Sequence, residues 1–345
     1  MDLKQFLFES KANLEKGGEL KICLSNMSCD LNSLCSTLVF SYSRNLIPVI
    51  NMSQYVFLNK KENVFVCEEL GITCDDLIFI NGECFEFKAC EITKTIKIDG
   101  EKILLYLVSE SEPSRLFQDS KLKLIADINE LSKSFNKDIE VYIETNVKSC
   151  SSLISRITQV SKEIKKALFY SILFDTDNLN ISTEIDREQF KSICLENNFS
   201  EEYRLEILAL LKKLRKENEA EQTDFILLRK DYREFGNFGL SSVRYGLLKW
   251  IYRNGLEYFR NEVKTFMDIQ QIEYLFINFN CKFNGERKRF LVIFPQDFIH
   301  VDKLFDFIPR KEIKKYEDLI YYGLNPDFSR KNIVPALRKF FDSTI

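Results

Sequence analysis

The sequence predicts an α/β protein with two domains. In its first half, short runs rich in β-branched residues alternate with amphipathic segments, which is typical of a parallel sheet covered by helices. The chain has 345 residues, of which 45% are hydrophobic, so it can bury two cores. Residues 1–200 carry a charge of −7 (23 Lys+Arg, 30 Asp+Glu) and residues 201–345 one of +4 (26 and 22), a split that fits two domains.

The first domain is expected to contain a parallel sheet. Amphipathic segments at Asp30–Tyr42 and Lys61–Leu70 lie between its strands. Ligands bind at the carboxyl ends of such strands, and the turns "SNMSCD" and "VSESEPS" both follow strand ends. The predicted strands are Leu20–Leu24, Ile47–Asn51, Leu77–Ile80, Ile103–Val108, Leu122–Ala126 and Ile139–Ile143.

Helices are expected to separate the two domains. Residues Ser149–Phe174 have the pattern of long helices, and Asn180–Glu221 is charged with a 3.6-residue periodicity. A junction near residues 178–195 divides the chain into domains 1–185 and 186–345. In the second domain we expect strands at Phe225–Leu228, Tyr274–Phe279 and Phe290–Phe294, a turn at Gly236–Gly239, a helix through Trp250 and a last helix after Ser329.

The composition excludes several classes of function. The single histidine, His300, argues against histidine metal clusters and a Ser–His–Asp triad. The ten cysteines form no CxxC pair, which favours reduced thiols in a cytoplasmic protein. The apolar runs are too short to span a bilayer, and the N-terminal segment lacks the pattern of a signal peptide, so no membrane partner is expected.

The turn after the first strand is the first candidate site. Asn26, Asp30 and Asn32 carry oxygen ligands of the kind that Mg²⁺ or Mn²⁺ prefers. The alternative is a polar turn in which Asp30 or Ser28 caps the following helix. Both interpretations are open at this stage.

Two basic segments in the second half are candidate anion sites. A strand is expected to deliver Arg229 and Lys230 to its end beside Asp231, with an exposed charge pair as the alternative. Ser329 is a candidate N-cap, followed by Arg330 and Lys331 in the first turn of a helix. Cations there oppose the helix dipole unless the helix N-terminus binds an anion.

Five segments of the first half form a set, in chain order "SNMSCDLNSLCSTLVFSY", "ILLYLVSESEPS", "KLKLIADINEL", "IETNVKSCSSLISRI" and "ALFYSILFDTDNLN". Together they resemble the DHH phosphoesterase superfamily, in its exopolyphosphatase and prune-type branch. In the second half, "LLRKDYREF" with "GLSSV", and "SRKNIVPAL", resemble the DHH-associated C-terminal domain. The resemblance implies a parallel-sheet domain and a smaller α/β domain with an anion-binding cleft between them.

The resemblance also implies which residues form the site. In this family two divalent metals, held by Asp, Asn and His, activate a water that attacks phosphorus. Here Asn26, Asp30, Asp127 and Asp175 remain as candidate ligands, whereas Asn32, Ser109, Glu110, Ile128 and Asn129 occupy degenerate positions. We therefore expect no resident cofactor beyond one weakly held Mg²⁺ or Mn²⁺, with Glu110 as a further ligand. The phosphate contacts of the family fall on Arg229, Lys230, Ser329, Arg330 and Lys331.

Loss of metal ligands beside retained cations predicts a catalytically inactive, exopolyphosphatase-like binding protein. Its ligand would be a nucleotide, polyphosphate, or an RNA or ribonucleoprotein such as the ribosome; no DNA-specific motif is present. The basic segment "NGERKRF", from Asn284 to Phe290, is the candidate RNA contact, with a solvated hairpin as the alternative. Two other hypotheses are an active metal-dependent phosphohydrolase with rearranged ligands and a structural partner whose cleft stays empty.

Overall fold

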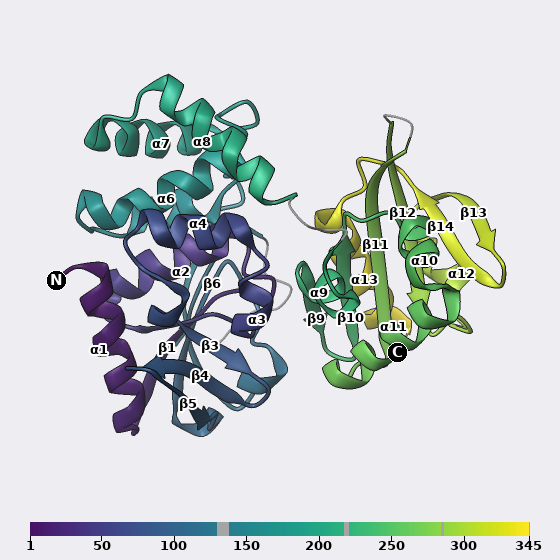
Figure 1. Ribbon diagram of the computed structural model, residues 1–345, viewed down its shortest axis with the longest axis horizontal. Coiled ribbons are helices and arrows are strands. Elements are labelled where there is room, and N and C mark those ends of the chain that lie inside the picture. The colour runs from purple at the N-terminus through teal and green to yellow at the C-terminus, as the bar shows by residue number, and fades with distance from the viewer. Residues whose placement is uncertain (130–137, 217–220, 284–285, 345) are drawn as a thin grey trace. The chain divides into compact units, whose positions relative to one another are not determined.

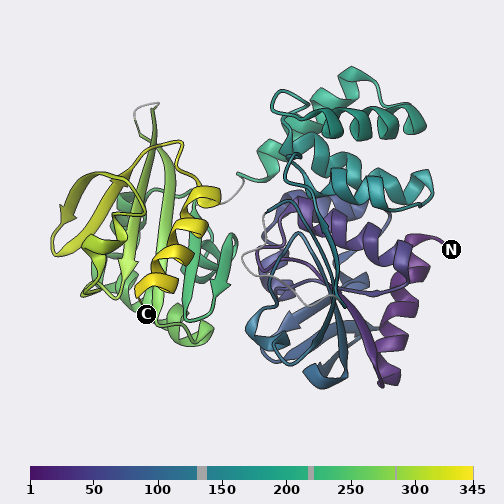
Figure 2. The same ribbon diagram turned by 180° about the vertical axis from the view of Figure 1, so that it is seen from behind.

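The computed structural model describes residues 1–129, 138–216, 221–283 and 286–344 of the chain (Figures 1 and 2). The chain forms two compact units, Met1–Glu217 and Asn218–Ile345. Each unit combines a β-sheet with helices, so the prediction of a two-part α/β protein is confirmed.

The first unit is built around a five-stranded parallel sheet of strand order β2-β1-β6-β7-β8. Its central strands are almost wholly buried, as the near-continuous apolar runs in the sequence predict. The strands are β1 (Leu20–Leu24), β2 (Ile47–Val49), β6 (Ile103–Val108), β7 (Lys121–Asp127) and β8 (Glu140–Ile143), close to the predicted ranges.

One predicted strand lies outside this sheet. The segment expected at Leu77–Ile80 is β3 (Ile78–Asn81), which pairs antiparallel with β4 (Cys84–Ala89), and β4 pairs with β5 (Ile92–Lys97). A tight turn with Gly82 at φ 59° joins β3 to β4, so no crossover helix is available to make that pair parallel. This small sheet and helix α1 (Leu3–Lys16) share a core with one face of the parallel sheet.

Helices cover the other face of the parallel sheet in two layers. Helix α2 (Leu31–Arg44) and helix α5 (Cys150–Ile157) lie next to the strands, and α6 (Lys162–Asp175) packs on both of them. Helices α7 (Glu184–Asn197) and α8 (Glu201–Leu214) pack on α6 in turn, which is visible in Figure 1. The short helices α3 (Gln54–Phe57) and α4 (Lys61–Glu69) complete the unit.

The division between the units lies further along the chain than the expected 185/186. Residues 186–217, which the sequence analysis placed in the second domain, belong to the first unit. The reason is aromatic packing: the Phe169 ring of α6 stacks with Phe190 at 5.5 Å and Tyr203 at 6.1 Å and contacts Phe199 at 4.4 Å. The sequence of α7 and α8 is rich in charged residues, so these few aromatic contacts could not be recognised from it.

The second unit is a six-stranded sheet of order β13-β14-β12-β11-β10-β9 with helices on both faces. Phe276, Leu291 and other apolar residues of one face form a core with the last helix, α13, seen in front of the sheet in Figure 2. On the other face Trp250 of α10 packs edge-on against Phe259 of α11 and Phe279 of β11.

The strands of this unit are β9 (Tyr232–Phe235), β10 (Phe238–Val243), β11 (Tyr274–Phe283), β12 (Glu286–Phe294), β13 (Arg310–Tyr316) and β14 (Leu319–Leu324). Its helices are α9 (Asp224–Arg229), α10 (Leu247–Asn254), α11 (Leu256–Gln270), α12 (Val301–Leu304) and α13 (Arg330–Thr344). The helix through Trp250 and the last helix after Ser329 are thus confirmed. The turn expected at Gly236–Gly239 is shorter, because only Gly236 and Asn237 lie between β9 and β10, and Gly239 belongs to β10.

The strand predicted at Phe225–Leu228 is wrong, because this segment is helix α9. Thr223 caps the helix by accepting a hydrogen bond from the backbone N of Ile226, and Asp224 lies in its first turn. A short apolar run has no periodicity that separates a strand from a buried helical turn. Thr223 and Asp224, which are typical of a helix N-terminus, were the signal for a helix rather than a strand.

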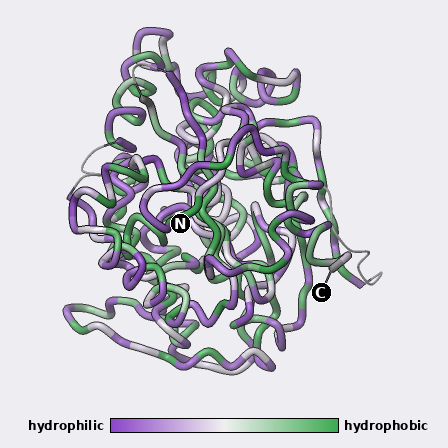
Figure 3. Tube along the Cα trace, turned by 90° about the vertical axis from the view of Figure 1, so that its right-hand side faces the viewer, coloured by the Kyte–Doolittle hydropathy of each residue, from purple (hydrophilic) through white to green (hydrophobic). Residues whose placement is uncertain are grey.

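Hydrophobic and hydrophilic residues are interleaved along the whole trace, as Figure 3 shows. Among the described residues, no helix is both long enough and apolar enough to cross a membrane.

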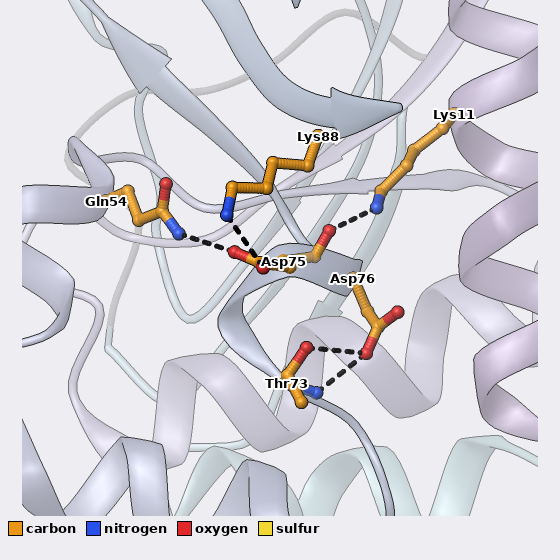
Figure 4. A network of polar contacts seen from close by, with 6 residues as sticks. All are labelled: Lys11, Gln54, Thr73, Asp75, Asp76 and Lys88. Carbon is orange, nitrogen blue, oxygen red and sulfur yellow. Dashed lines mark hydrogen bonds and ion pairs between the residues drawn. The ribbon is translucent and has the colours of Figure 1, made fainter. Parts of the chain in front are cut away.

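A polar network joins the N-terminal helix to the small sheet of the first unit (Figure 4). Lys88 of β4 donates to the Asp75 carboxylate at 2.9 Å, and Gln54 donates to its other oxygen at 3.2 Å. The ammonium group of Lys11 donates to the Asp75 backbone carbonyl, and burial lowers the pKa of Lys11. Because these contacts join α1, α3 and β4 through one short turn, they tie segments far apart in the sequence together.

This network predicts an acid dependence of stability. The hydrogen bond from Lys88 lowers the pKa of Asp75 below 3.8, so the carboxylate contributes stability at higher pH that is lost as pH falls through its folded pKa. Asp75 is half exposed, so the Lys88→Met variant should lose less than about 1 kcal/mol near neutral pH. Its difference from the wild type should shrink as pH falls below 3.8, measured by urea unfolding at several pH values. Lys97→Met, at an exposed lysine of β5, is the control and should show no such pH-dependent difference.

Candidate functional site

The polar residues of the first unit gather at one edge of its parallel sheet. The loop after β1 carries Asn26 and Asp30, the loop after β6 carries Ser109 and Glu110, and β7 ends at Asp127. Strands β1, β6 and β7 are adjacent and parallel, so their carboxyl ends meet at the same edge. This is the edge at which open α/β sheets bind ligands.

Asn26 and Ser109 connect the first two loops directly. The Asn26 amide nitrogen lies 3.3 Å from the Ser109 carbonyl oxygen and 3.5 Å from its hydroxyl, and the Asn26 oxygen accepts from Ser28 at 3.0 Å. Ser109 has the left-handed φ of 58°, and its backbone N donates to Ala126 O at 2.8 Å. The position at which the family resemblance implies a carboxylate is therefore a strained serine between β6 and β7.

Asp30 caps helix α2. Its carboxylate accepts a hydrogen bond from the backbone N of Ser33 at 3.0 Å, as the capping interpretation predicts. Its charge also reaches two buried thiols, since Asp30 contributes to the raised pKa values of Cys35 and Cys150, for which burial is the main cause. A metal role for Asp30 stays a prediction.

Asn32 faces the N-terminus of helix α5. Its side-chain oxygen accepts from the Ser151 backbone N at 2.9 Å, the Ser149 hydroxyl at 3.0 Å and the Ser151 hydroxyl at 3.1 Å, with a longer contact from Ser36 at 3.4 Å. The residue is 8% exposed. A carbonyl oxygen has two lone pairs, so these donors leave it little capacity to bind a cation.

Asp127 is buried at the end of β7, where it is 1% exposed. One carboxylate oxygen accepts from the backbone N of Ile128 at 2.7 Å and from the Asn129 amide at 3.1 Å. Two positions at which the resemblance implies histidine ligands therefore supply one apolar side chain and one donor to Asp127. Asp175, the last residue of α6, is an electrostatic neighbour of Cys35, as Asp30 is.

Several oxygens of these side chains are engaged by donors of the protein. The Asn32 oxygen and one Asp127 oxygen accept hydrogen bonds from the protein, and the Glu110 carboxylate accepts from the Ser111 backbone N at 3.1 Å. Within residues 1–129, 138–216, 221–283 and 286–344, no three His, Cys, Asp or Glu residues are grouped so that they could hold an ion. A single weak site at Asp30, Asp127, Asp175 and Glu110 stays a prediction.

The cations of the second unit lie at helix ends. Arg229 is 8% exposed at the end of α9, with its guanidinium 5.6 Å from the Tyr232 ring centre, and Lys230 follows as the C-cap. The expected strand end is thus a helix C-terminus, where cations interact favourably with the helix dipole. Ser329 precedes α13, and its backbone N and hydroxyl donate to the Asn332 side chain at 2.9 and 3.1 Å. Arg330 begins the helix; the side chain of Lys331 lies outside what the structure describes.

Sequence reasoning missed two groups of residues. The hydroxyl groups of Ser149 and Ser151 donate hydrogen bonds to the Asn32 side chain, although no role was predicted for either serine. Arg289 was assigned to the basic loop "NGERKRF"; Asn284 and Gly285 of that loop lie outside the described residues, and Glu286–Phe290 belong to β12. Arg289 is 5% exposed, and the strand alternation that places it inward was the available signal.

The first unit combines a parallel sheet with polar strand ends, and the second is an α/β unit with cations at helix termini. A solved structure from Methanococcus jannaschii, assigned as a family II inorganic pyrophosphatase, matches this chain with a TM-score of 0.64 and 17% identity, over 94% of this chain and 100% of that one. The chain therefore shares the fold of that structure. No family model matches the sequence.

A more distant likeness is to an exopolyphosphatase-related protein from Bacteroides fragilis. The match covers 98% of this chain and 96% of that one, with 10% identity and a TM-score of 0.38. A score this low adds nothing to the fold assignment.

Proposed function

We propose that this protein binds phosphate-containing ligands on a DHH phosphoesterase fold and does not hydrolyse them. The observation that carries the proposal is the Asn32 oxygen, whose lone pairs are taken by donors of α5 at 2.9–3.1 Å. A two-metal phosphohydrolase needs carboxylates that are shared between its ions. An amide that holds a helix N-terminus does not supply one.

The cations of the second unit support the binding half of the proposal. Arg229, Lys230, Ser329, Arg330 and Lys331 follow the phosphate-contact motifs that the resemblance implies. Ser329 and Arg330 lie at the N-terminus of α13, where backbone N–H groups and the helix dipole favour an anion. A nucleotide or polyphosphate is the small-ligand form of the proposal. An RNA or ribonucleoprotein in the cytoplasm, such as the ribosome, is the macromolecular form.

The competing function is an active metal-dependent phosphohydrolase. It is favoured by the fold shared with a protein assigned as an inorganic pyrophosphatase, and by acidic residues at neighbouring strand ends. In that case Asp30, Asp127 and Asp175 would have to turn toward a common ion, away from the contacts described above.

Phosphate release decides between the two functions. The purified chain at high concentration is incubated with polyphosphate, pyrophosphate and a nucleotide panel in Mg²⁺, Mn²⁺ or Co²⁺. We expect no release above that of the Asp127→Ala variant, because the wild type lacks the ligands for two metals. Steady turnover that disappears in Asp127→Ala would show that the protein is an enzyme.

The same preparation supplies the control for folding and the test of binding. Circular dichroism establishes that the chain is folded, and calorimetry with pyrophosphate and ADP measures binding. Sedimentation with ribosomes or RNA tests the macromolecular form. A folded chain that neither releases phosphate nor binds any of these would leave only the structural-partner hypothesis.

A further inference from the structure

A buried arginine lies beside the loop that leads into α13. The sheet register places Arg289 of β12 opposite Leu324, the last residue of β14, and the loop 325–329 follows immediately. The Arg289 Nε donates to the Pro326 carbonyl of this loop at 2.5 Å. The side chain is on the face that α13 covers, because Leu291 of the same strand face contacts that helix core.

This arginine has no carboxylate partner in the part of the chain that the structure describes. It forms no ion pair there, and its one hydrogen bond uses a single N–H of the guanidinium group. Burial lowers the pKa of Arg289 to about 10, and the positive charge of Arg287 adds a smaller lowering. The negative charge of Asp327 raises this pKa, but its effect is the smallest of the three. Asp327 of the adjacent loop supplies only a weak counter-charge, and a cation that is 95% buried without an ion pair is costly to keep, so the arrangement favours a bound anion.

The neighbouring positions on this face are polar as well. Asn280 is opposite Arg289 across the β11–β12 ladder and accepts from Arg287 at 3.0 Å. Asn278, one step further along the face, is 1% exposed, and its side-chain oxygen has no hydrogen-bond partner among the described residues. The apolar core under α13 thus gives way to polar groups at the end of the sheet where that helix begins.

We propose that Arg289 is the buried cation of an oxyanion site at the N-terminus of α13, and that the site takes a phosphate group. The free guanidinium N–H groups of Arg289 and the first backbone N–H groups of α13 would donate to the oxyanion from two sides. This inference rests on the proposed phosphate-binding function and adds to it a residue that neither the motifs nor the resemblance assigns. The loop 325–329 connects the two donor groups through the Arg289–Pro326 hydrogen bond.

The test uses the full chain and inorganic phosphate, with chloride at the same ionic strength as the reference. We expect Arg289→Met to weaken phosphate binding in calorimetry at least about tenfold, since a charge-assisted contact is lost. Without phosphate, its melting temperature should equal or exceed that of the wild type, because the desolvated charge is gone. A purely structural arginine gives the reverse pattern: a lower melting temperature and unchanged phosphate affinity, which would overturn the proposal.

Two further variants keep the test decisive. Arg287→Met removes an exposed cation two residues away on the same strand face and should change the affinity less than about threefold, because a charge in contact with water interacts weakly at a distance on the order of 7 Å. Arg289→Lys keeps the charge but loses the planar donor set, so it should bind about threefold more weakly and serves if Arg289→Met does not fold. Equal affinity in Arg289→Lys and the wild type would count against a guanidinium-specific contact.

The outcomes also separate this inference from the function on which it rests. If the wild type binds pyrophosphate or ADP, but Arg289→Met binds phosphate as well as the wild type does, the proposed function stands and the role of Arg289 is wrong. If Arg289→Met loses phosphate while Arg330→Glu with Lys331→Glu retains it, the anion does not lie at the N-terminus of α13, and the proposed Arg289 site is wrong. If the wild type binds none of these anions, both proposals fail.

Discussion

Replacing Asn32 by leucine is expected to lower the free energy of unfolding by about 3 kcal/mol. The Asn32 oxygen is the acceptor for the Ser149 hydroxyl and for the backbone N and hydroxyl of Ser151. These donors belong to buried residues, so leucine would take this acceptor from the Ser149 hydroxyl and the Ser151 backbone N, whereas the Ser151 hydroxyl could still donate to Ser36. Urea unfolding of both proteins measures the difference.

Asn32→Asp is the matched variant, because the same donors can donate to a carboxylate. A negative charge at the N-terminus of α5 is favoured by the helix dipole, so the stability should stay within about 1 kcal/mol of the wild type. If leucine is tolerated as well as aspartate, the Asn32 contacts contribute nothing to the fold. That result would also contradict the proposal that the Asn32 oxygen is engaged by the N-terminus of α5.

Reversing the charges of Arg330 and Lys331 together, in Arg330→Glu with Lys331→Glu, should weaken pyrophosphate binding about 100-fold, or nearly 3 kcal/mol. Both residues occupy the first turn of α13, which is a helix N-terminus suited to anions. Two carboxylates there repel a phosphate group and compete for the same backbone N–H groups. Calorimetry with pyrophosphate measures the loss.

Lys311→Glu with Lys315→Glu makes the same change in net charge at two exposed lysines of β13. This control should weaken pyrophosphate binding less than about threefold, because exposed charges that do not touch the ligand interact with it weakly through water. A comparable loss in both double variants would mean that net charge, rather than a site at α13, governs binding. Unchanged binding in both would contradict the cation set proposed for the second unit.

The parallel sheet was the most predictable part of this fold. The carboxyl-terminal parts of its central strands are apolar and buried on both faces, which gives each of these strands a signal that does not depend on its neighbours. Helix α9 and the division of the units were not predicted correctly. Phe225–Leu228 is too short for its periodicity to decide, and α7 joins the first unit through contacts of the Phe169 ring.

The candidate site was predictable in composition but not in contacts. The sequence alone determined which side chains stand at the strand ends, that only one histidine is available, and that Ser329 and Arg330 open a helix. These features depend on residues close together in the chain. They could therefore be recognised from spacing, caps and the family resemblance.

Only the tertiary structure decided what these side chains do. Asn32 accepts hydrogen bonds from residues 117 and 119 positions away. Arg289 of β12 donates a hydrogen bond to Pro326, which lies 37 positions away in the loop after β14. A side chain's hydrogen-bond partners and burial, which decide whether it offers an oxygen to a metal or a cation to an anion, are set by sheet register and helix packing. Those distant contacts have no local signal, so the contacts of Asn32 with the N-terminus of α5 and the burial of Arg289 appear only in the folded chain.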